Sequence, residues 1–223
     1  MGGGQAWLIR PGASSDCAFL ARVDMQASTP PFAVTAWQRF VEPVGTPVLA
    51  FLEAMYRHRA NNWGNPEDFL VLEADGSPAA AIAGFAAKTG DRRNIDLERL
   101  PAMAKSLGWD ARQIEIFLER YHQIWGPVEA LSYMEPHAEW LLESLAVMPE
   151  ARGRGFARRL LDAVVREGRA KGHRSAGMFM VQGNVAAATL FEAAGFTVWA
   201  RHDSDEFGGD YPGIVKYRRS LDE

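Results

Sequence analysis

The sequence has a single cysteine, Cys17, among its 223 residues. One cysteine excludes an intramolecular disulfide, and its place in a predicted amphipathic helix favours a small core residue over a nucleophile. No stretch approaches the roughly 18 apolar residues that a membrane-spanning helix needs. The first residues lack the features of a signal peptide and the Ser or Thr of a myristoylation site. We therefore expect a cytoplasmic protein with no membrane partner.

The sequence also lacks two common phosphate-binding signatures. No Gly-x-x-x-x-Gly-Lys-Ser/Thr string occurs in the chain, which excludes a P-loop. A dinucleotide fingerprint requires Gly or Ala three residues after Gly155, where this chain has Arg158. We also predict that the protein holds no metal.

Composition and charge limit the classes of protein to which the chain can belong. Hydrophobic residues make up 48% of it, enough for a sizeable core, and the length favours one domain over residues 1–223. Residues 152–174 hold eight Lys or Arg and two Asp or Glu, a net charge of +6, which leaves −10 for the remainder. This basic segment lacks interleaved aromatic residues, and the acidic remainder would repel nucleic-acid phosphates. We therefore predict an anionic ligand but no nucleic-acid partner.

The basic segment begins where a predicted strand passes through a tight loop into a helix. The apolar run 140–147 stops before Pro149, and a charged loop containing Gly153 and Gly155 follows. Apolar residues then recur at helical spacing, at Phe156, Leu160, Leu161, Val164 and Val165. Glycine lets a ligand approach the backbone, and the first N–H groups of a helix have no intrahelical partner. Together with the helix dipole and four arginines, Arg152, Arg154, Arg158 and Arg159, these donors predict a phosphate site.

Two motifs make this interpretation more specific. Residues 152–157 read Arg-x-x-Gly-x-Ala directly after the strand, and residues 184–196 read Asn-x-x-Ala-x-x-Leu-Phe-x-x-x-Gly-Phe. Both resemble the GNAT superfamily of acyl-CoA N-acyltransferases, whose pyrophosphate loop has the pattern Gln/Arg-x-x-Gly-x-Gly/Ala. The opening Ile-Arg-Pro-Gly-Ala-Ser-Ser-Asp, residues 9–16, looks like the first strand and helix of the same superfamily.

Hydrophobic periodicity and turn residues place the predicted elements along the chain. Strands are expected at 7–10, in a hairpin over 68–87, and at 139–147, 175–181, 196–201 and 214–219. In the superfamily the hairpin leads almost directly into the next strand, whereas residues 88–138 intervene here. We expect helices in this insertion, one of them capped by Asp110 and Gln113. The insertion is either a wall or lid for the acceptor substrate or a packing element.

The resemblance implies an α/β (α+β) fold with a mixed, twisted, largely antiparallel sheet flanked by helices. The helical insertion would lie between the third and fourth strands, and strands 140–147 and 175–181 would splay apart. Backbone groups exposed by the splay would then bind the pantetheine arm of acetyl-CoA or another acyl-CoA. The cofactor-binding residues implied are Leu145, Ala146, Val147, Arg152, Gly153, Arg154, Gly155, Phe156, Ala157, Arg158, Asn184, Ala187 and Phe191.

The implied reaction is direct transfer of an acetyl group to a primary amine of a small molecule or peptide. A neutral amine must attack the thioester, so a base is needed, together with a donor for the developing oxyanion. Strand amides near Leu145 and Ala146 are candidates for that donor. Glu143 is our candidate base, because strand alternation places it on the face of Val147. Glu135, His137 and Glu139, just before the strand, are the alternatives.

One departure from the superfamily pattern concerns the acid that protonates the leaving thiolate. Many relatives carry a tyrosine where this chain has Phe191, which has no hydroxyl group. Water, Tyr211 or Tyr217 are alternative proton donors. The departure also motivates a second hypothesis, a non-catalytic acyl-CoA-binding sensor of the same fold.

The acceptor leaves little trace in the sequence. An acidic loop with Asp203, Asp205, Glu206 and Asp210 would attract a cationic amine, although solvated loop acids are the simpler explanation. The sequence is also compatible with a homodimer.

Overall fold

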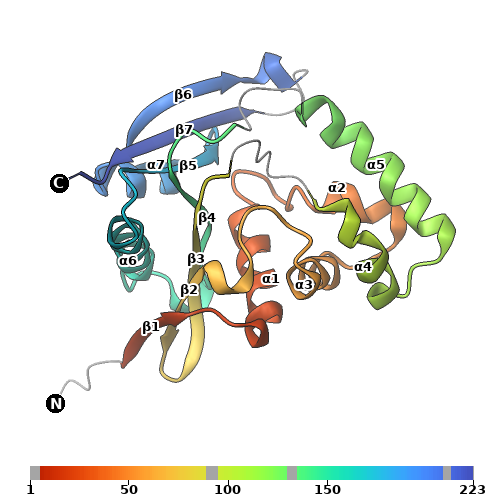
Figure 1. Cartoon of the computed structure of the whole chain (residues 1–223), viewed down its shortest axis with the longest axis horizontal. Coiled ribbons are helices and arrows are strands. Elements are labelled where there is room, and N and C mark those ends of the chain that lie inside the picture. Colours follow the sequence, from red (N-terminus) through yellow and green to blue (C-terminus); the bar gives the residue numbers. More distant parts are fainter. Residues whose placement is uncertain (1–5, 89–94, 130–134, 208–211, 223) are drawn as a thin grey trace.

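A seven-stranded mixed sheet forms the centre of the computed structural model, which describes residues 6–88, 95–129, 135–207 and 212–222 (Figure 1). The strands are β1 (Trp7–Pro11), β2 (Phe69–Ala74), β3 (Ser77–Ala86), β4 (Trp140–Val147), β5 (Ser175–Val181), β6 (Thr197–Asp203) and β7 (Gly213–Ser220). Their order in the sheet is β1-β2-β3-β4-β5-β7-β6. Neighbouring strands run antiparallel except β4 and β5, which are parallel. The predicted mixed, largely antiparallel sheet is confirmed.

Helices cover both faces of this sheet. They are α1 (Cys17–Ala27), α2 (Gln38–Val41), α3 (Val48–His58), α4 (Leu100–Leu107), α5 (Ala111–Glu129), α6 (Phe156–Ala170) and α7 (Val185–Ala193). Figure 1 shows α6 and α7 on one side of the sheet and α1 and α3 on the other, with α4 and α5 farther out. Among the described residues, no helix is both long enough and apolar enough to cross a membrane.

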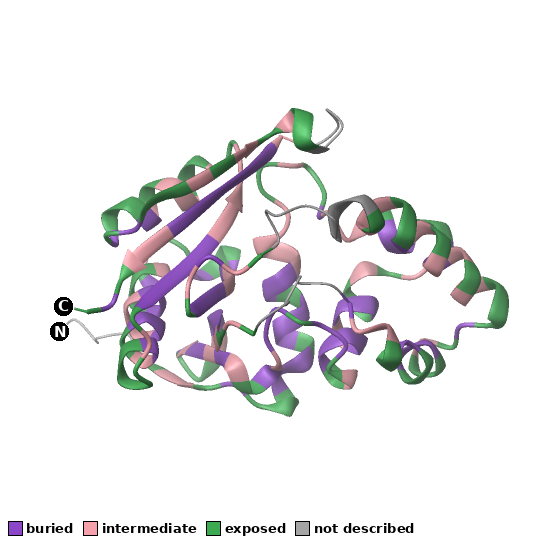
Figure 2. Ribbon diagram, turned by 45° about the horizontal axis from the view of Figure 1, so that its top comes forward, coloured by how far each residue is buried: buried purple, intermediate pink, exposed green. Residues whose placement is uncertain are grey.

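Burial follows this layering. Leu160, Leu161 and Val164 of α6 pack against β2, β3 and β4 in one apolar cluster, and Leu20 and Val23 of α1 pack on the opposite face in another. Figure 2 shows β7 largely buried, whereas β6 at the sheet edge and much of α5 are exposed. The core therefore lies on both faces of strands β2, β3 and β4.

The hairpin predicted over 68–87 is present as β2 and β3. Asp75 and Gly76 form its two-residue turn with φ angles of 53° and 80°. Two positive φ angles suit the right-handed twist of the flanking strands, which is why Asp-Gly is a strong hairpin signal. The turn thus confirms that local sequence determines this part of the sheet.

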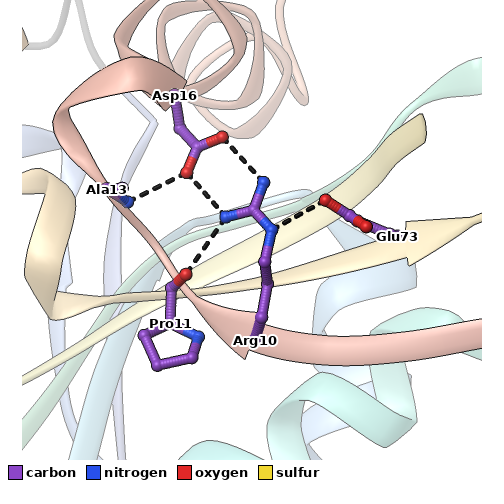
Figure 3. Close-up of polar contacts among 5 residues, drawn as sticks. All are labelled: Arg10, Pro11, Ala13, Asp16 and Glu73. Atoms are coloured by element: carbon purple, nitrogen blue, oxygen red, sulfur yellow. Dashed lines mark hydrogen bonds and ion pairs between the residues drawn. The ribbon is translucent and has the colours of Figure 1, made fainter. Parts of the chain in front are cut away.

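The first strand is tied to its neighbours by the ion pairs drawn in Figure 3. The Arg10 guanidinium donates to both carboxylate oxygens of Asp16, at 2.7 and 2.9 Å, and to Glu73 of β2 at 2.7 Å. These bonds hold the pKa of the Asp16 carboxyl below its usual range. Asp16 also accepts the Ala13 amide at 2.9 Å, so this carboxylate organises the entry into α1.

The predicted helical insertion between the third and fourth strands is confirmed by α4 and α5, although residues 89–94 and 130–134 lie outside the described ranges. Asp110 and Gln113 form the expected capping box, each side chain accepting the backbone N–H of the other at 2.8 and 3.1 Å. Phe117 of α5 packs on Phe51 of α3, with ring centroids 5.5 Å apart. The insertion therefore contributes to a second apolar cluster with α2 and α3.

The two central strands part soon after they begin. β4 pairs with β5 only at Trp140 with Ala176 and at Leu141 with Gly177. Beyond that point β4 keeps only β3 as its partner, and β5 keeps only β7. The predicted splay is thus confirmed, and it leaves one side of each strand without a neighbouring strand.

A bulge in β4 changes which way its side chains face. Ala81 pairs with Ala146 and Ala83 with Glu143, so Ile82 alone opposes two residues of β4. Ser144, one of those two, has a φ of 52°, which a non-glycine residue rarely adopts. Strict alternation along β4 therefore ends at Ser144.

This bulge corrects the reasoning that placed Glu143 and Val147 on one face. Glu143 pairs with Ala83, which belongs to the cluster beneath α1, whereas Val147 pairs with Ala80 in the cluster beneath α6. Directly paired residues project to the same side of a sheet. Glu143 and Val147 consequently lie on opposite faces, because the bulge inserts an extra residue between them.

Close packing of α6 on β3 depends on a missing side chain at Gly84. A Cβ atom built there would lie 2.3 Å from Cγ2 of Val164 and 2.9 Å from Cζ2 of Trp140. We expect Gly84→Ala to lower the free energy of unfolding by about 1–3 kcal/mol through overpacking, measured by denaturant titration. The double variant Gly84→Ala/Val164→Ala should lose less than the sum of the single losses. Strict additivity would contradict the steric cause.

Candidate functional site

The loop between β4 and α6 presents a series of backbone donors. Gly153 and Gly155 have φ angles of 76° and 74°, and a Cβ atom built at either would meet nothing within 4 Å. The amides of residues 153–158 make no hydrogen bond to any other described residue. Successive amides in such a turn form a concave anion site, and the N-terminus of α6 adds its dipole. These donors are therefore available to an anion, and the diphosphate site at 152–157 stays a prediction.

The arginines around this loop are held by neighbouring groups. Arg152 donates to Gln26 at 2.9 Å and to the Val147 carbonyl at 3.3 Å. Arg154 lies 3.4 Å from the Asp75 carboxylate and over the ring of Phe156. These exposed contacts contribute little to stability and can be exchanged for a phosphate.

The other two arginines are engaged along the sides of α6. Arg158 pairs with Asp162 at 3.0 Å and donates to the Ala193 carbonyl at the end of α7 at 2.8 Å. Arg159 lies over the ring of Trp7, 4.5 Å from its centroid. The side chains of Arg158 and Arg159 thus have other partners in this structure. The backbone amide of Arg158 is still one of the open amides of residues 153–158.

A cavity of about 250 Å³ opens where β4 and β5 part. Residues 142–145 of β4, 178–181 of β5, two residues of α7 and its N-cap Asn184 form one side of it. The other side comes from α1, the segment after it, α2, Trp63 and Trp125 of α5. The insertion therefore packs against α2 and α3, and its residue Trp125 lines the cavity. Its role toward an acceptor substrate stays a prediction.

The structure brings together only some of the residues predicted to bind the cofactor. Leu145, Asn184, Ala187 and Phe191 line the cavity, and the amides of 153–158 lie in the adjoining loop. Ala146 and Val147 are not among the lining residues, and the side chain of Phe156 is buried in the core beneath α6. Any contribution of these three residues would come from their backbone atoms.

Asn184 has a structural role besides its place in the cavity wall. Its Oδ1 atom accepts the Ala187 amide at 3.2 Å and so caps α7. Asn is a favoured N-cap because its side chain replaces a missing intrahelical acceptor. The amide nitrogen of its side chain is the group that would face a ligand.

Glu143 lines the cavity, whereas the alternative bases do not. His137 is buried, with Nε2 2.9 Å from the carbonyl oxygen of Tyr217. Glu139 accepts the Arg174 amide at 2.8 Å, and Glu135 is exposed, its carbonyl accepting from Lys216. Position in the cavity therefore favours Glu143.

Phe191 stands in the cavity wall where a hydroxyl group was expected from the motif. Its ring packs edge-on against Tyr217, with centroids 5.6 Å apart. The Tyr217 hydroxyl donates to Glu192 at 3.2 Å, and Tyr217 does not line the cavity. Burial raises the pKa of Tyr217. Tyr211, the other predicted proton donor, lies outside the described residues.

The acidic loop after β6 takes no part in the cavity wall among the described residues. Asp203 accepts from Gln182 at 3.1 Å, and Glu206 lies 2.9 Å from Nδ1 of His202. Hydrogen bonding to His202 lowers the pKa of Glu206. Asp205 is exposed and does not line the cavity, and Asp210 lies outside the described residues.

Asp24 is a cavity residue that sequence reasoning missed. It lies on α1, is 4% exposed, and accepts hydrogen bonds from three neutral donors. These are Trp37 Nε1 at 3.2 Å, Tyr56 Oη at 3.0 Å and Trp63 Nε1 at 3.2 Å. The available signal was its position: Asp24 follows Leu20 by four residues, which places a carboxylate on the buried face of an amphipathic helix.

Burial raises the pKa of Asp24 above its ordinary value of 3.8, despite the three hydrogen bonds that favour the ionised form. The folded state therefore holds the Asp24 proton more tightly than the unfolded chain does. Its contribution to stability should be full below pH 3.8 and should fall as pH rises toward the raised pKa, by up to about 1.4 kcal/mol per pH unit. Denaturant unfolding of the wild type and Asp24→Asn across this range should show that difference. A wild type that gains stability relative to the variant as pH rises would contradict it.

The described residues contain no group of three or more His, Cys, Asp or Glu placed to hold a metal ion. The described part of the cavity wall offers the two carboxylates Asp24 and Glu143 and several aromatic rings.

Comparison with known proteins gives a family match and a set of similar folds. Residues 36–196 match the family model described as acetyltransferase (GNAT) family. A solved acetyltransferase superposes with a TM-score of 0.60 at 18% identity, covering 96% of this chain and 100% of that chain. No curated protein matches significantly.

Two further solved structures come from named organisms. YncA of Salmonella typhimurium, solved with its cofactor acetyl-CoA, has a TM-score of 0.54 at 20% identity and covers 98% of this chain and 95% of its own. An N-acetyltransferase from Staphylococcus aureus Mu50 has a TM-score of 0.58 at 16% identity and covers 95% and 100%. Identities this low show a shared fold alone.

Proposed function

Since the chain belongs to the acetyltransferase (GNAT) family, we propose that it transfers the acetyl group of acetyl-CoA to a primary amine of a small molecule or peptide. The observation that carries this proposal is the row of open amides at residues 153–158 beside a cavity between parted strands. An anion site and an apolar slot side by side suit a ligand that is anionic at one end and reactive at the other.

Backbone groups do most of the binding in this proposal. The amides of 153–158 hold the diphosphate, and the unpaired edge of β4 around Leu145 and Val147 bonds the extended pantetheine arm. Asn184 and Ala187 border the same arm from α7. Binding through main-chain donors explains why the arginines of the loop can keep other partners.

The chemical step requires proton removal from the amine and stabilisation of a developing oxyanion. Acetyl-CoA supplies the activated acyl group as a thioester. Glu143, in the cavity wall, removes the proton from the attacking nitrogen directly or through water. A strand amide near Leu145 or Ala146 donates to the oxyanion. The parting of the strands supports this assignment, since β4 has no partner on its β5 side beyond Leu141.

Phe191 supports a second candidate, an acyl-CoA sensor without catalysis. A phenyl ring cannot protonate the leaving thiolate, so water or another residue such as Tyr211 would have to do so in an active enzyme. Both candidates require cofactor binding, and only the enzyme releases free thiol when an amine is present.

The test is an assay of CoA thiol release across a panel of primary amines, with acetyl-CoA affinity measured separately. Amine-dependent thiol release with one acetylated product per thiol supports the transferase. Tight acetyl-CoA binding without turnover on any amine supports the sensor. Absence of acetyl-CoA binding would contradict both candidates.

A further inference from the structure

One side of the cavity has no role in cofactor binding. It is built from α1, the segment that follows α1, α2, Trp63 and α5, and its members include Asp24, Trp37, Phe40 and Trp125. These elements lie on the α1 side of the sheet, away from the α6 loop that offers the anion site. This wall is therefore the part of the cavity left for the acceptor.

The wall holds a carboxylate that is buried without a cationic partner. Asp24 receives only neutral donors, two indole N–H groups and one phenol, and it forms no ion pair with any described Lys, Arg or His. Burying a carboxylate in this way costs free energy unless charge compensation arrives from elsewhere. A cationic ligand in the cavity would supply that compensation.

Aromatic rings surround the space beside this carboxylate. Trp37 stacks on Trp63 with centroids 5.2 Å apart, and Phe40 lies 5.7 Å from Trp37 and 6.3 Å from Trp125. The faces of aromatic rings carry negative potential and attract ammonium groups, while their area accommodates apolar bodies. The aromatic side chains of this wall thus suit both the ammonium group and the apolar body of an organic cation.

The charge of the cavity lining also favours a cationic ligand. Its described lining contains two carboxylates, Asp24 and Glu143, and no Lys, Arg or His. An anionic acceptor would be repelled, and a cationic one would be drawn in. Beyond the two acids, the side-chain polar groups are few: Ser28, Ser144, Asn184, the two indole N–H groups already bound to Asp24 and the indole N–H of Trp125.

We propose that the acceptor is a small primary amine on an aromatic or alkyl body, held by Asp24 as the counter-ion of its ammonium group and by the aromatic side chains of the wall, Trp37 and Trp63 among them. The proposal rests on the proposed function, since it names the substrate class of the same site. A peptide or polyamine fits less well, because the described part of this wall has few polar groups for a peptide backbone and a single carboxylate, Asp24, for several cations. Asp24 binds the ammonium form, and Glu143 then takes the proton before transfer.

The test measures binding to the complex of the enzyme with CoA, so that no turnover occurs. The probes are 2-phenylethylamine and its neutral counterpart 2-phenylethanol, titrated by calorimetry. We expect the wild type to bind the ammonium probe at least about ten-fold more tightly than the alcohol. Asp24→Asn should reduce that ratio to about two-fold or less while leaving the affinity for the alcohol within about two-fold.

A purely structural Asp24 gives a different result. If Asp24 only ties together Trp37, Tyr56 and Trp63, its replacement should weaken both probes alike, and that outcome would overturn the proposal. Equal affinity of the wild type for the two probes would also overturn it, whether or not Asp24→Asn folds. Tighter binding of spermidine or of a lysine peptide than of 2-phenylethylamine would reject the substrate class.

Failure of this inference is distinguishable from failure of the proposed function. If the wild type does not bind CoA, the proposed function itself is contradicted. Normal CoA binding with no preference for the ammonium probe would overturn only the acceptor assignment. Trp37→Leu is a second variant: it keeps an apolar side chain, and it should weaken the ammonium probe more than the alcohol.

Discussion

Gly155→Val should raise the dissociation constant of acetyl-CoA by about 100-fold or more, measured by calorimetry. Gly155 has a φ of 74° and precedes the first turn of α6, and a Cβ atom built there would meet nothing within 4 Å. A valine side chain would occupy that space and prevent the diphosphate from reaching several donors at once. Loss of two hydrogen bonds to a charged group, at about 1.5–3 kcal/mol each, accounts for the expected change.

The same substitution at the other end of α6 is the control. Gly172 has a φ of 87°, and a Cβ atom there would also meet nothing within 4 Å. Gly172→Val should therefore carry a similar backbone strain and a similar loss of stability, with unchanged affinity for acetyl-CoA. If Gly155→Val and Gly172→Val lose the same affinity for acetyl-CoA, the cause is a folding defect, and the assignment of residues 152–157 as a phosphate loop is contradicted.

Glu143→Gln should lower kcat by about 10²–10⁴-fold while leaving the dissociation constant of acetyl-CoA nearly unchanged. The substitution keeps the shape of the side chain in the cavity wall and removes its ability to accept a proton. The dependence of kcat on pH on the acid side should disappear with it, because glutamine does not titrate. Steady-state kinetics with a saturating amine provide the measurement.

Glu139→Gln is the matched control for that experiment. Glu139 precedes β4, accepts the Arg174 amide and does not line the cavity. Its replacement should leave kcat within about two-fold, as expected for a surface carboxylate. A rate that survives Glu143→Gln with its pH profile intact would remove Glu143 as the base and direct attention to Asp24.

Sequence reasoning succeeded where structure is determined within a few residues. The loop at 152–157 and helix α6 were predicted because an apolar strand, two glycines and a helical apolar stripe follow one another directly. The capping box of α5 and the Asp75-Gly76 turn are local in the same sense. Such patterns predict geometry because the hydrogen bonds that they form lie within one turn of the chain.

Side-chain placement around the cavity required contacts between distant segments. Alternation along β4 predicted a shared face for Glu143 and Val147, whereas the register with β3 contains a bulge that separates them. Asp24 was overlooked because its three donors come from positions 37, 56 and 63, which only folding brings together. Neither feature has a local signal strong enough to reveal its partners.

The sequence by itself determined the family, the order of the strands along the chain and the glycine-rich loop at the start of α6, because each depends on neighbouring residues. Tertiary structure decided that β4 turns Glu143 into the cavity and that a buried Asp24 stands among tryptophans opposite it. The physical reason is that pairing register and burial are properties of segments packed against one another, and a linear pattern does not specify which segments will meet.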